Sequence, residues 1–231
     1  MLHVEGLNVS QGDFALRADF TVQSGRHVAV IGPSGAGKST LLGAIGGYVP
    51  IVSGRIFVDE HDVTQEPPHE RGIAMLFQDA NLFPHLSLAQ NIGLALRSSL
   101  RPTPSEHARI LSALDRVGLA GLEDRMPGDV SGGQQSRAAL ARVLVQAKPL
   151  VLLDEPFAAL GPALRSEMLA LTSALAQENG ATVVMITHDP KDAEKAADEV
   201  IFVDAGKAHA PRPVSALMTD PPAALRAYLG T

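Results

Sequence analysis

One eight-residue segment constrains the fold of this chain more than any other part of its sequence. Residues 32–39 read Gly-Pro-Ser-Gly-Ala-Gly-Lys-Ser, which matches the pattern G-x-x-x-x-G-K-[ST]. The segment follows a short run rich in β-branched residues, His27–Ile31, and precedes a helix-like stretch, Lys38–Gly47. Backbone N–H groups of such a loop, together with the positive end of the helix dipole, attract a phosphate. The segment therefore predicts a strand–loop–helix unit with a phosphate-binding loop (P-loop) in an α/β fold.

The residues of this loop each have an expected role toward a nucleoside triphosphate. Lys38 is expected to reach the β- and γ-phosphates, and the Ser39 hydroxyl is expected to bind Mg²⁺. A glycine-rich turn with a solvated lysine is the alternative, and the strand–loop–helix context disfavours it. The candidate nucleotide-binding residues of this region are Gly32, Pro33, Ser34, Gly35, Ala36, Gly37, Lys38, Ser39 and Thr40.

Two adjacent acids follow a strand of the type that is buried on both faces. The strand is Leu150–Leu153, and Asp154 and Glu155 come directly after it. A P-loop nucleotide hydrolase needs a second Mg²⁺-binding carboxylate, and Asp154 stands where that group is expected. Glu155 is placed to accept a proton from an attacking water, which is a general-base role. Two acids after an apolar strand are commonplace, so they indicate a nucleotide-hydrolysing site only because the chain also contains a P-loop.

A second candidate anion site lies at the start of a helix-like stretch, Ser136–Gln146. The preceding residues are Ser131, Gly132, Gly133 and Gln134. Ser131 by itself is explained as a helix N-cap followed by two flexible glycines. The backbone amides at such a helix start also form an anion site, in a chain that already has one.

Strand and helix signals alternate along most of the chain. Apolar alternation in Leu2–Val9 and Phe14–Val22 predicts an antiparallel pair, and later strands separated by helices predict a mostly parallel sheet. From 79 to 147 helices dominate, so we expect a helical subdomain inserted into an α/β core of residues 1–78 and 148–231. The later predicted strands are Ile56–Val58, Ile73–Phe77, Leu150–Leu153, Thr182–Ile186 and Val200–Val203.

Helix starts are predicted from caps. Thr103 with Pro104 and Glu106 predicts a helix that extends to about residue 117. A second helix is predicted to begin at Pro190, after Asp189. A third is predicted to begin at Pro162 and to end near Gly180.

Composition excludes several function classes. The net charge of −6 and the nine aromatic residues argue against nucleic-acid binding. Absence of cysteine removes thiolate metal sites and cysteine nucleophiles, and the eight histidines lack ligand-type spacing. No apolar run approaches the roughly 18 to 20 residues that span a bilayer, so we expect any membrane role to come through a partner.

Taken together, these motifs resemble the nucleotide-binding subunit of ABC transporters over nearly the whole chain. The P-loop, Gln78, the segment Ser131–Gln134, Leu150–Glu155 and His188 occur in the order and approximate spacing of that family. The resemblance implies an α/β P-loop ATPase core with an inserted helical subdomain and an N-terminal antiparallel β region. It also implies that Gln78 contacts Mg²⁺ and the attacking water, and that His188 contacts the γ-phosphate of ATP.

The resemblance further implies partners. Two subunits would pair head to tail, with residues 131–134 of one closing over the ATP held by the P-loop of the other. Two transmembrane permease subunits would dock near Asp79–Leu100, which places the chain at the cytoplasmic face of the inner cell membrane. A periplasmic solute-binding protein would act indirectly.

The chain departs from the family pattern at two positions. Gly161 stands where the family usually has an aspartate that couples the two sites of the dimer, so coupling or rate is expected to differ. Gln11 stands near the turn where an aromatic residue usually stacks on adenine. Phe14 is a candidate substitute, and a core-facing phenylalanine is the alternative.

The stretch from Pro67 to Leu94 resembles the ATPase subunits of bacterial importers, and within them those of thiamine uptake systems. We therefore expect ATP hydrolysis coupled to uptake of a small solute, thiamine or its phosphates. The alternatives are an importer of iron, polyamine or sulfate, a non-transport ABC ATPase, and a P-loop kinase of a small metabolite.

Overall fold

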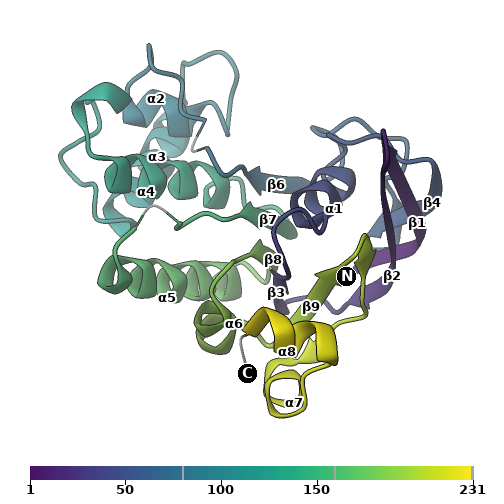
Figure 1. Ribbon diagram of the computed structural model, residues 1–231. Coiled ribbons are helices and arrows are strands. Elements are labelled where there is room, and N and C mark those ends of the chain that lie inside the picture. Colours follow the sequence, from purple (N-terminus) through teal and green to yellow (C-terminus); the bar gives the residue numbers. More distant parts are fainter. Residues whose placement is uncertain (80, 159, 230–231) are drawn as a thin grey trace.

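The computed structural model describes residues 1–79, 81–158 and 160–229, and a mixed eleven-stranded sheet runs through this part of the chain (Figure 1). Its path is β5-β4-β1-β2-β10-β9-β3-β8-β7-β6, with β11 paired to β9. The strands are β1 (Leu2–Gln11), β2 (Phe14–Val22), β3 (His27–Ile31), β4 (Ser53–Val58), β5 (His61–Asp62), β6 (Ile73–Leu76), β7 (Leu150–Asp154), β8 (Thr182–Ile186), β9 (Glu199–Asp204), β10 (Lys207–Ala208) and β11 (Arg212–Pro213).

Eight helices and one 3₁₀ turn accompany the sheet in the described residues. They are α1 (Lys38–Ile45), α2 (Leu88–Gly93), α3 (Pro104–Arg116), η1 (Pro127–Asp129), α4 (Gly132–Leu144), α5 (Pro162–Glu178), α6 (Pro190–Ala196), α7 (Val214–Thr219) and α8 (Ala223–Leu229). None of the helices in residues 1–79, 81–158 and 160–229 is long and apolar enough to cross a bilayer.

The N-terminal part of the sheet is antiparallel, as predicted. β1 pairs with β2 and β4, and side chains along β2 alternate between exposed and buried. The turn between β1 and β2 is tighter than the sequence predicted: Gln11 pairs with Phe14, so only Gly12 and Asp13 lie outside the strands. Alternation of this kind follows from burying one face of an antiparallel sheet while the other meets water.

The rest of the sheet is mostly parallel. β3 pairs in parallel with β9 and β8, β7 pairs with β8 and β6, and every residue of β7 and β8 is buried. Continuous β-branched and leucine runs suit strands that are covered on both faces. One face packs with α1 and the N-terminal strands, and the other packs against α4 and α5.

The helices α2, α3 and α4 pack together on their own apolar cluster, which includes Leu88, Ile92, Ile110 and Leu114 (Figure 1, teal). Residues 77–149 connect β6 to β7, two neighbouring parallel strands, so this helical lobe is an insertion between them. The fold class is therefore that of an α/β core with an inserted helical lobe and an N-terminal antiparallel region.

The predicted caps of α3 and α6 are present. The Thr103 hydroxyl accepts from the Glu106 amide, and the Asp189 carboxylate accepts from the Lys191 amide. The start of α4 was predicted wrongly: the helix begins at Gly132 rather than Ser136. Ser131 and Gln134 form a reciprocal capping box, and this outweighs the low helix propensity of two glycines.

Candidate active site

Four neighbouring strands bring the predicted site residues to one edge of the sheet. The P-loop comes directly after β3, and Gln78 lies two residues after the end of β6. Asp154 is the last residue of β7, and Glu155 comes directly after it. His188 lies two residues after the end of β8. The register pairs Val30 with Ile186 and Ile186 with Asp154, so the carboxyl ends of these parallel strands are level. Polar side chains beyond the carboxyl ends of parallel strands form the usual ligand crevice of an open α/β sheet.

The P-loop requires glycine where its backbone meets β9. Gly32 has φ of +153°, and a Cβ placed on it would lie 2.0 Å from the carbonyl oxygen of Val203. At the other end of the loop, Gly37 has φ of +107° and an added Cβ would lie 2.6 Å from the ring of Phe14. A larger residue at either position would therefore distort the loop.

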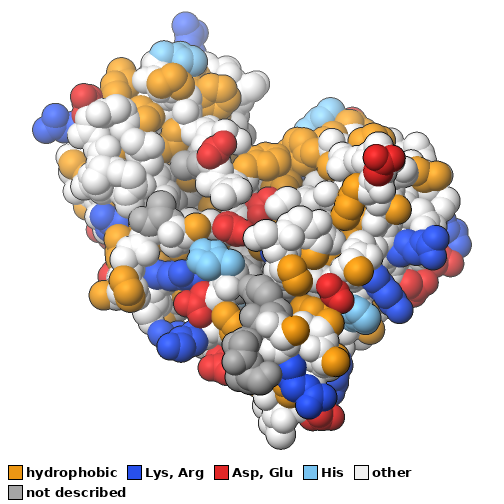
Figure 2. Space-filling model, in the orientation of Figure 1, with side chains coloured by type: hydrophobic (Ala, Val, Ile, Leu, Met, Phe, Trp, Pro, Cys, Tyr) orange, Lys and Arg blue, Asp and Glu red, His pale blue; other side chains and the backbone are white. Residues whose placement is uncertain are grey.

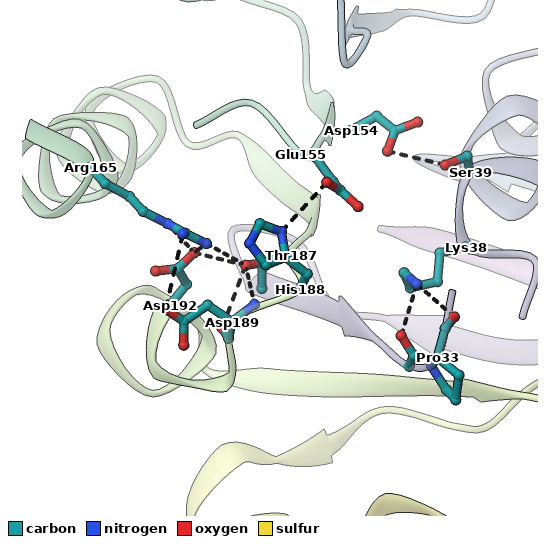
Figure 3. Close-up of polar contacts among 11 residues, drawn as sticks. Pro33, Lys38, Ser39, Asp154, Glu155, Arg165, Thr187, His188, Asp189 and Asp192 are labelled. Atoms are coloured by element: carbon teal, nitrogen blue, oxygen red, sulfur yellow. Dashed lines mark hydrogen bonds and ion pairs between the residues drawn. The ribbon is translucent and has the colours of Figure 1, made fainter. Parts of the chain in front are cut away.

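Lys38 folds back over the loop that carries it (Figure 3). Its Nζ donates to the carbonyl oxygens of Gly32 at 2.8 Å and Pro33 at 2.9 Å. Burial lowers the pKa of Lys38, and the nearby carboxylates of Glu155 and Asp154 partly oppose that shift. The ammonium is thus held at the loop with carboxylates nearby, in position to meet an incoming anion.

Ser39 and Asp154 supply paired oxygen donors. The Ser39 hydroxyl donates to Asp154 Oδ1 at 3.2 Å, and the Asp154 residue is 7% exposed. Burial raises the pKa of Asp154, while the hydrogen bond from Ser39 acts in the opposite direction. A hydroxyl and a carboxylate within this distance fit a small hard cation such as Mg²⁺, which prefers oxygen ligands.

Glu155 has an unusual backbone and a polar neighbour. Its φ is +46°, a left-handed conformation that non-glycine residues adopt infrequently and that clusters at functional sites. His188 Nδ1 lies 3.5 Å from Glu155 Oε2 (Figure 3). The two side chains predicted to face the γ-phosphate and the attacking water are therefore in contact.

Gln78 lies at the same sheet edge as Asp154 and Glu155, whereas the segment Ser131–Gln134 lies apart from them on the helical lobe. Gln78 is exposed just beyond β6, at the same edge of the sheet as Asp154. Ser131 is the N-cap of α4 on the helical lobe, and within the described residues no hydrogen bond joins the segment to the P-loop. One copy of the chain thus gathers every predicted site residue except this segment and Thr40, which lies inside α1 and has no side-chain hydrogen bond within the described residues.

A hollow of about 420 Å³ lies beside the P-loop and is large enough for a nucleoside. Its walls are residues 13–15, 33–36 and 204–206. Phe14 lines this hollow and is also half-buried against the N-terminal apolar cluster and Gly37. Both predicted placements of the Phe14 ring, against the core and beside a base site, are thus compatible with its position.

Sequence reasoning missed a buried polar cluster behind His188. Arg165 of α5, Asp192 of α6 and Thr187 share hydrogen bonds there (Figure 3). A single arginine and a single aspartate 27 residues apart leave no signal in one sequence, because their pairing depends on how α5 and α6 pack.

Comparison with known proteins gives one family. The sequence pattern of the family described as "ABC transporter" matches residues 16–158, more than half of the chain. The thiamine import ATP-binding protein ThiQ of Cereibacter sphaeroides is 58% identical over 230 residues, with full coverage of both chains. Proteins of the same name from Ruegeria sp. and Brucella suis are 52% and 44% identical, and the alignments cover 99–100% of this chain.

Solved structures agree with the sequence comparison. A dimeric ATP-binding cassette in a post-hydrolysis state, bound to ADP and Pi, superposes with a TM-score of 0.82 at 28% identity. The match covers 93% of this chain and 99% of the cassette. A second dimeric structure, of a bacterial ABC transporter cassette, matches with the same TM-score.

Proposed function

Because the chain belongs to the ABC transporter family, we propose that it is the ATP-hydrolysing subunit of a bacterial importer for thiamine or its phosphates. The observation that carries the ATPase part is the convergence of the P-loop, Asp154, Glu155 and His188 at one sheet edge. Each group there has a role in phosphoryl transfer to water.

The binding step uses the P-loop. Its backbone amides and the N-terminus of α1 hold the phosphates of ATP, and Lys38 exchanges its bonds to the carbonyls of Gly32 and Pro33 for the β- and γ-phosphate oxygens. Ser39, Asp154 and Gln78 would hold Mg²⁺, which would supply positive charge against that of the phosphates. The hollow that includes Phe14 receives the nucleoside.

The hydrolytic step uses Glu155 and His188. Glu155 accepts the proton of the attacking water, and His188 donates a hydrogen bond to the γ-phosphate as charge develops there. The 3.5 Å separation of His188 Nδ1 and Glu155 Oε2 supports this division of roles, because the proposed base and the proposed donor lie together.

The second half of each site comes from another copy of the chain. Ser131, Gly132, Gly133 and Gln134 are exposed or half-exposed at the start of α4, and the solved cassettes of this fold are dimers. Two copies in a head-to-tail arrangement place this helix start over the partner's P-loop. Hydrolysis then requires a closed dimer with two ATP molecules.

The permease subunits dock on the segment Asp79–Leu100, in which Ala80 lies outside the described residues. Within this segment, Phe83 is 47% exposed. Tyr48, three residues after the end of α1, is 53% exposed, and its ring packs edge-on against the ring of Phe77. Figure 2 shows hydrophobic side chains along the notch between the two lobes. The chain thereby sits at the cytoplasmic face of the inner membrane without entering it.

Thiamine is proposed because two relatives that align over the whole chain, at 58% and 52% identity, are thiamine import ATP-binding proteins. The alternatives are importers of iron, polyamine or sulfate, and a transport assay distinguishes them from a thiamine importer.

Glu155→Gln tests the ATPase part. The amide keeps the size of the side chain but cannot accept the proton, so we expect hydrolysis to fall roughly 100-fold or more. ATP binding is expected to persist, and the dimer is expected to accumulate with ATP in size-exclusion chromatography. Glu178→Gln, an exposed acid at the end of α5, is the matched control with unchanged turnover. Undiminished hydrolysis in Glu155→Gln would refute the proposed mechanism.

A further inference from the structure

A buried ion pair lies directly behind His188. Arg165 reaches from α5 to Asp192 of α6, and their side chains are only 15% and 8% exposed (Figure 3). Arg165 Nε donates to Asp192 Oδ2 at 2.8 Å, and Arg165 Nη2 donates to the same oxygen. The Thr187 hydroxyl donates to that oxygen as well, at 2.7 Å. Three donors thus converge on one carboxylate oxygen.

This cluster fixes the backbone on both sides of His188. Thr187 Oγ1 accepts from the Asp189 amide at 3.1 Å and from Arg165 Nη2 at 3.2 Å. The Thr187 amide in turn donates to the carbonyl oxygen of Val30 in β3 at 3.2 Å. Residues 187 and 189 are therefore both tied down, whereas the His188 side chain between them is half-exposed and extends to Glu155.

Arg165 also lines a space next to the segment that follows Glu155. Arg165 lies in the first turn of α5, and its amide donates to the carbonyl oxygen of Gly161 at 2.9 Å. The side chain of Arg165 lines a small pocket together with residues 155–158 and 186–188. Arg165 therefore lines a space that it shares with the two loops that carry Glu155 and His188.

Stability alone is a weak reason for such a pair. Desolvating two charges costs about as much as their attraction returns, and a well-packed apolar pair is often as stable. A planar guanidinium with several donors does, however, fix geometry more tightly than an apolar contact. The arrangement favours a role in holding the imidazole at a set distance from Glu155.

We propose that Arg165, through Asp192 and Thr187, is a positioning residue that sets the place of His188 during ATP hydrolysis. The proposal rests on the role of His188 in the proposed function. Arg165 itself touches neither phosphate nor water in this scheme. Its loss changes turnover by displacing the imidazole.

The test is a double-mutant cycle in the full-length chain. Arg165→Ala is expected to lower kcat roughly 10- to 100-fold, because displacing a catalytic group by about 1 Å has effects of this size. The KM for ATP and the affinity for ADP are expected to stay within about twofold. In a His188→Ala background, Arg165→Ala is expected to cause no further loss, whereas Arg165→Lys in the wild type is expected to recover part of the turnover.

Thr187→Val provides a second variant that keeps the ion pair but removes the hydroxyl, and it is expected to show the same dependence on His188. Arg116→Ala removes an exposed ion pair at the far end of α5 and is the matched control with unchanged kcat. Equal losses with and without His188, or a rise in KM that accounts for the whole loss, would overturn the positioning role. Full turnover in His188→Ala alone would instead refute the part of the proposed function on which it rests.

Discussion

The Asp154 carboxylate is buried, and burial conflicts with the charge that a cation ligand must carry. Its pKa in the folded chain is raised by desolvation, so the folded state holds the proton more tightly than the unfolded chain does. The ionised form therefore destabilises the protein that holds no nucleotide. A bound cation removes this conflict by supplying the missing positive charge.

The variant Asp154→Asn tests whether the buried charge of Asp154 destabilises the protein without nucleotide. In the wild type, the stabilisation that comes from protonated Asp154 is fully present below the pKa of this group in the unfolded chain. It is lost as the pH rises through the raised pKa of the folded chain. The Tm of the variant without nucleotide should therefore exceed that of the wild type at pH 7.5, and the two values should converge toward pH 4. Thermal melts over this range measure the difference. A variant less stable at pH 7.5 and equally so at pH 4 would contradict this reasoning.

Among individual residues, those that belong to one short sequence motif could be predicted. The P-loop and the Asp154–Glu155 pair could be predicted because each lies within a few residues of one strand end. The Arg165–Asp192–Thr187 cluster and the left-handed conformation of Glu155 could not, because packing between separate elements determines both.

Among the elements, α5 begins without a side-chain cap. Its N-cap is Gly161, with φ of −65° and ψ of 158°, and no side-chain hydrogen bond closes the first turn. An added Cβ would meet nothing within 4 Å. The backbone there suits any N-cap residue, so the missing cap follows from the amino acid and not from crowding.

Gly161→Asp is therefore expected to raise stability by roughly 0.5–1 kcal/mol, from the new cap and from the lower entropy of the unfolded chain. For a chain of this size, that corresponds to an increase in Tm of about 1–4 °C. We also expect faster or better-coupled hydrolysis, as the aspartate usual in the family implies. A more stable variant with slower hydrolysis would count against the coupling role of this position.

The loop before α2 depends on one buried amide. Asn91 is 0% exposed; its Oδ1 accepts from the Phe83 amide at 2.7 Å and its Nδ2 donates to the carbonyl oxygens of Phe83, Leu86 and Ser87. The loop belongs to the proposed docking segment, so its shape is set from within the helical lobe.

Asn91→Leu would remove the side-chain partner of the Phe83 amide and of the Leu86 carbonyl oxygen, and we expect a loss of about 2–4 kcal/mol of folding free energy. The variant is expected to hydrolyse ATP as an isolated chain below its lowered Tm but to co-purify poorly with permease subunits. Co-purification at the wild-type level, despite the lower Tm, would show that the loop conformation is not needed for docking.

Element boundaries were predicted best where β-branched runs meet clear breaks. Phe14–Val22, His27–Ile31 and Thr182–Ile186 are strands with those bounds. The two-residue strands β5, β10 and β11 carry no such pattern, because their pairing is imposed by neighbouring strands. The start of α4 was missed because a capping box overrides a local preference against glycine.

At the scale of the whole molecule, the chain has the parts of an energy-supplying subunit. One sheet edge gathers the groups that we propose bind and hydrolyse ATP, and a separate lobe carries both the Ser131 helix start and the proposed docking segment. The solute itself has no proposed contact with this chain, so its identity must be tested in the assembled transporter.

Solute-stimulated ATP hydrolysis by the chain reconstituted in lipid vesicles with its permease subunits and solute-binding protein tests the central claim most directly. With thiamine present, we expect hydrolysis to rise several-fold and labelled thiamine to enter the vesicles, and we expect Glu155→Gln to abolish both. Hydrolysis that is unaffected by thiamine or its phosphates, but rises with iron, a polyamine or sulfate, would contradict the proposed function.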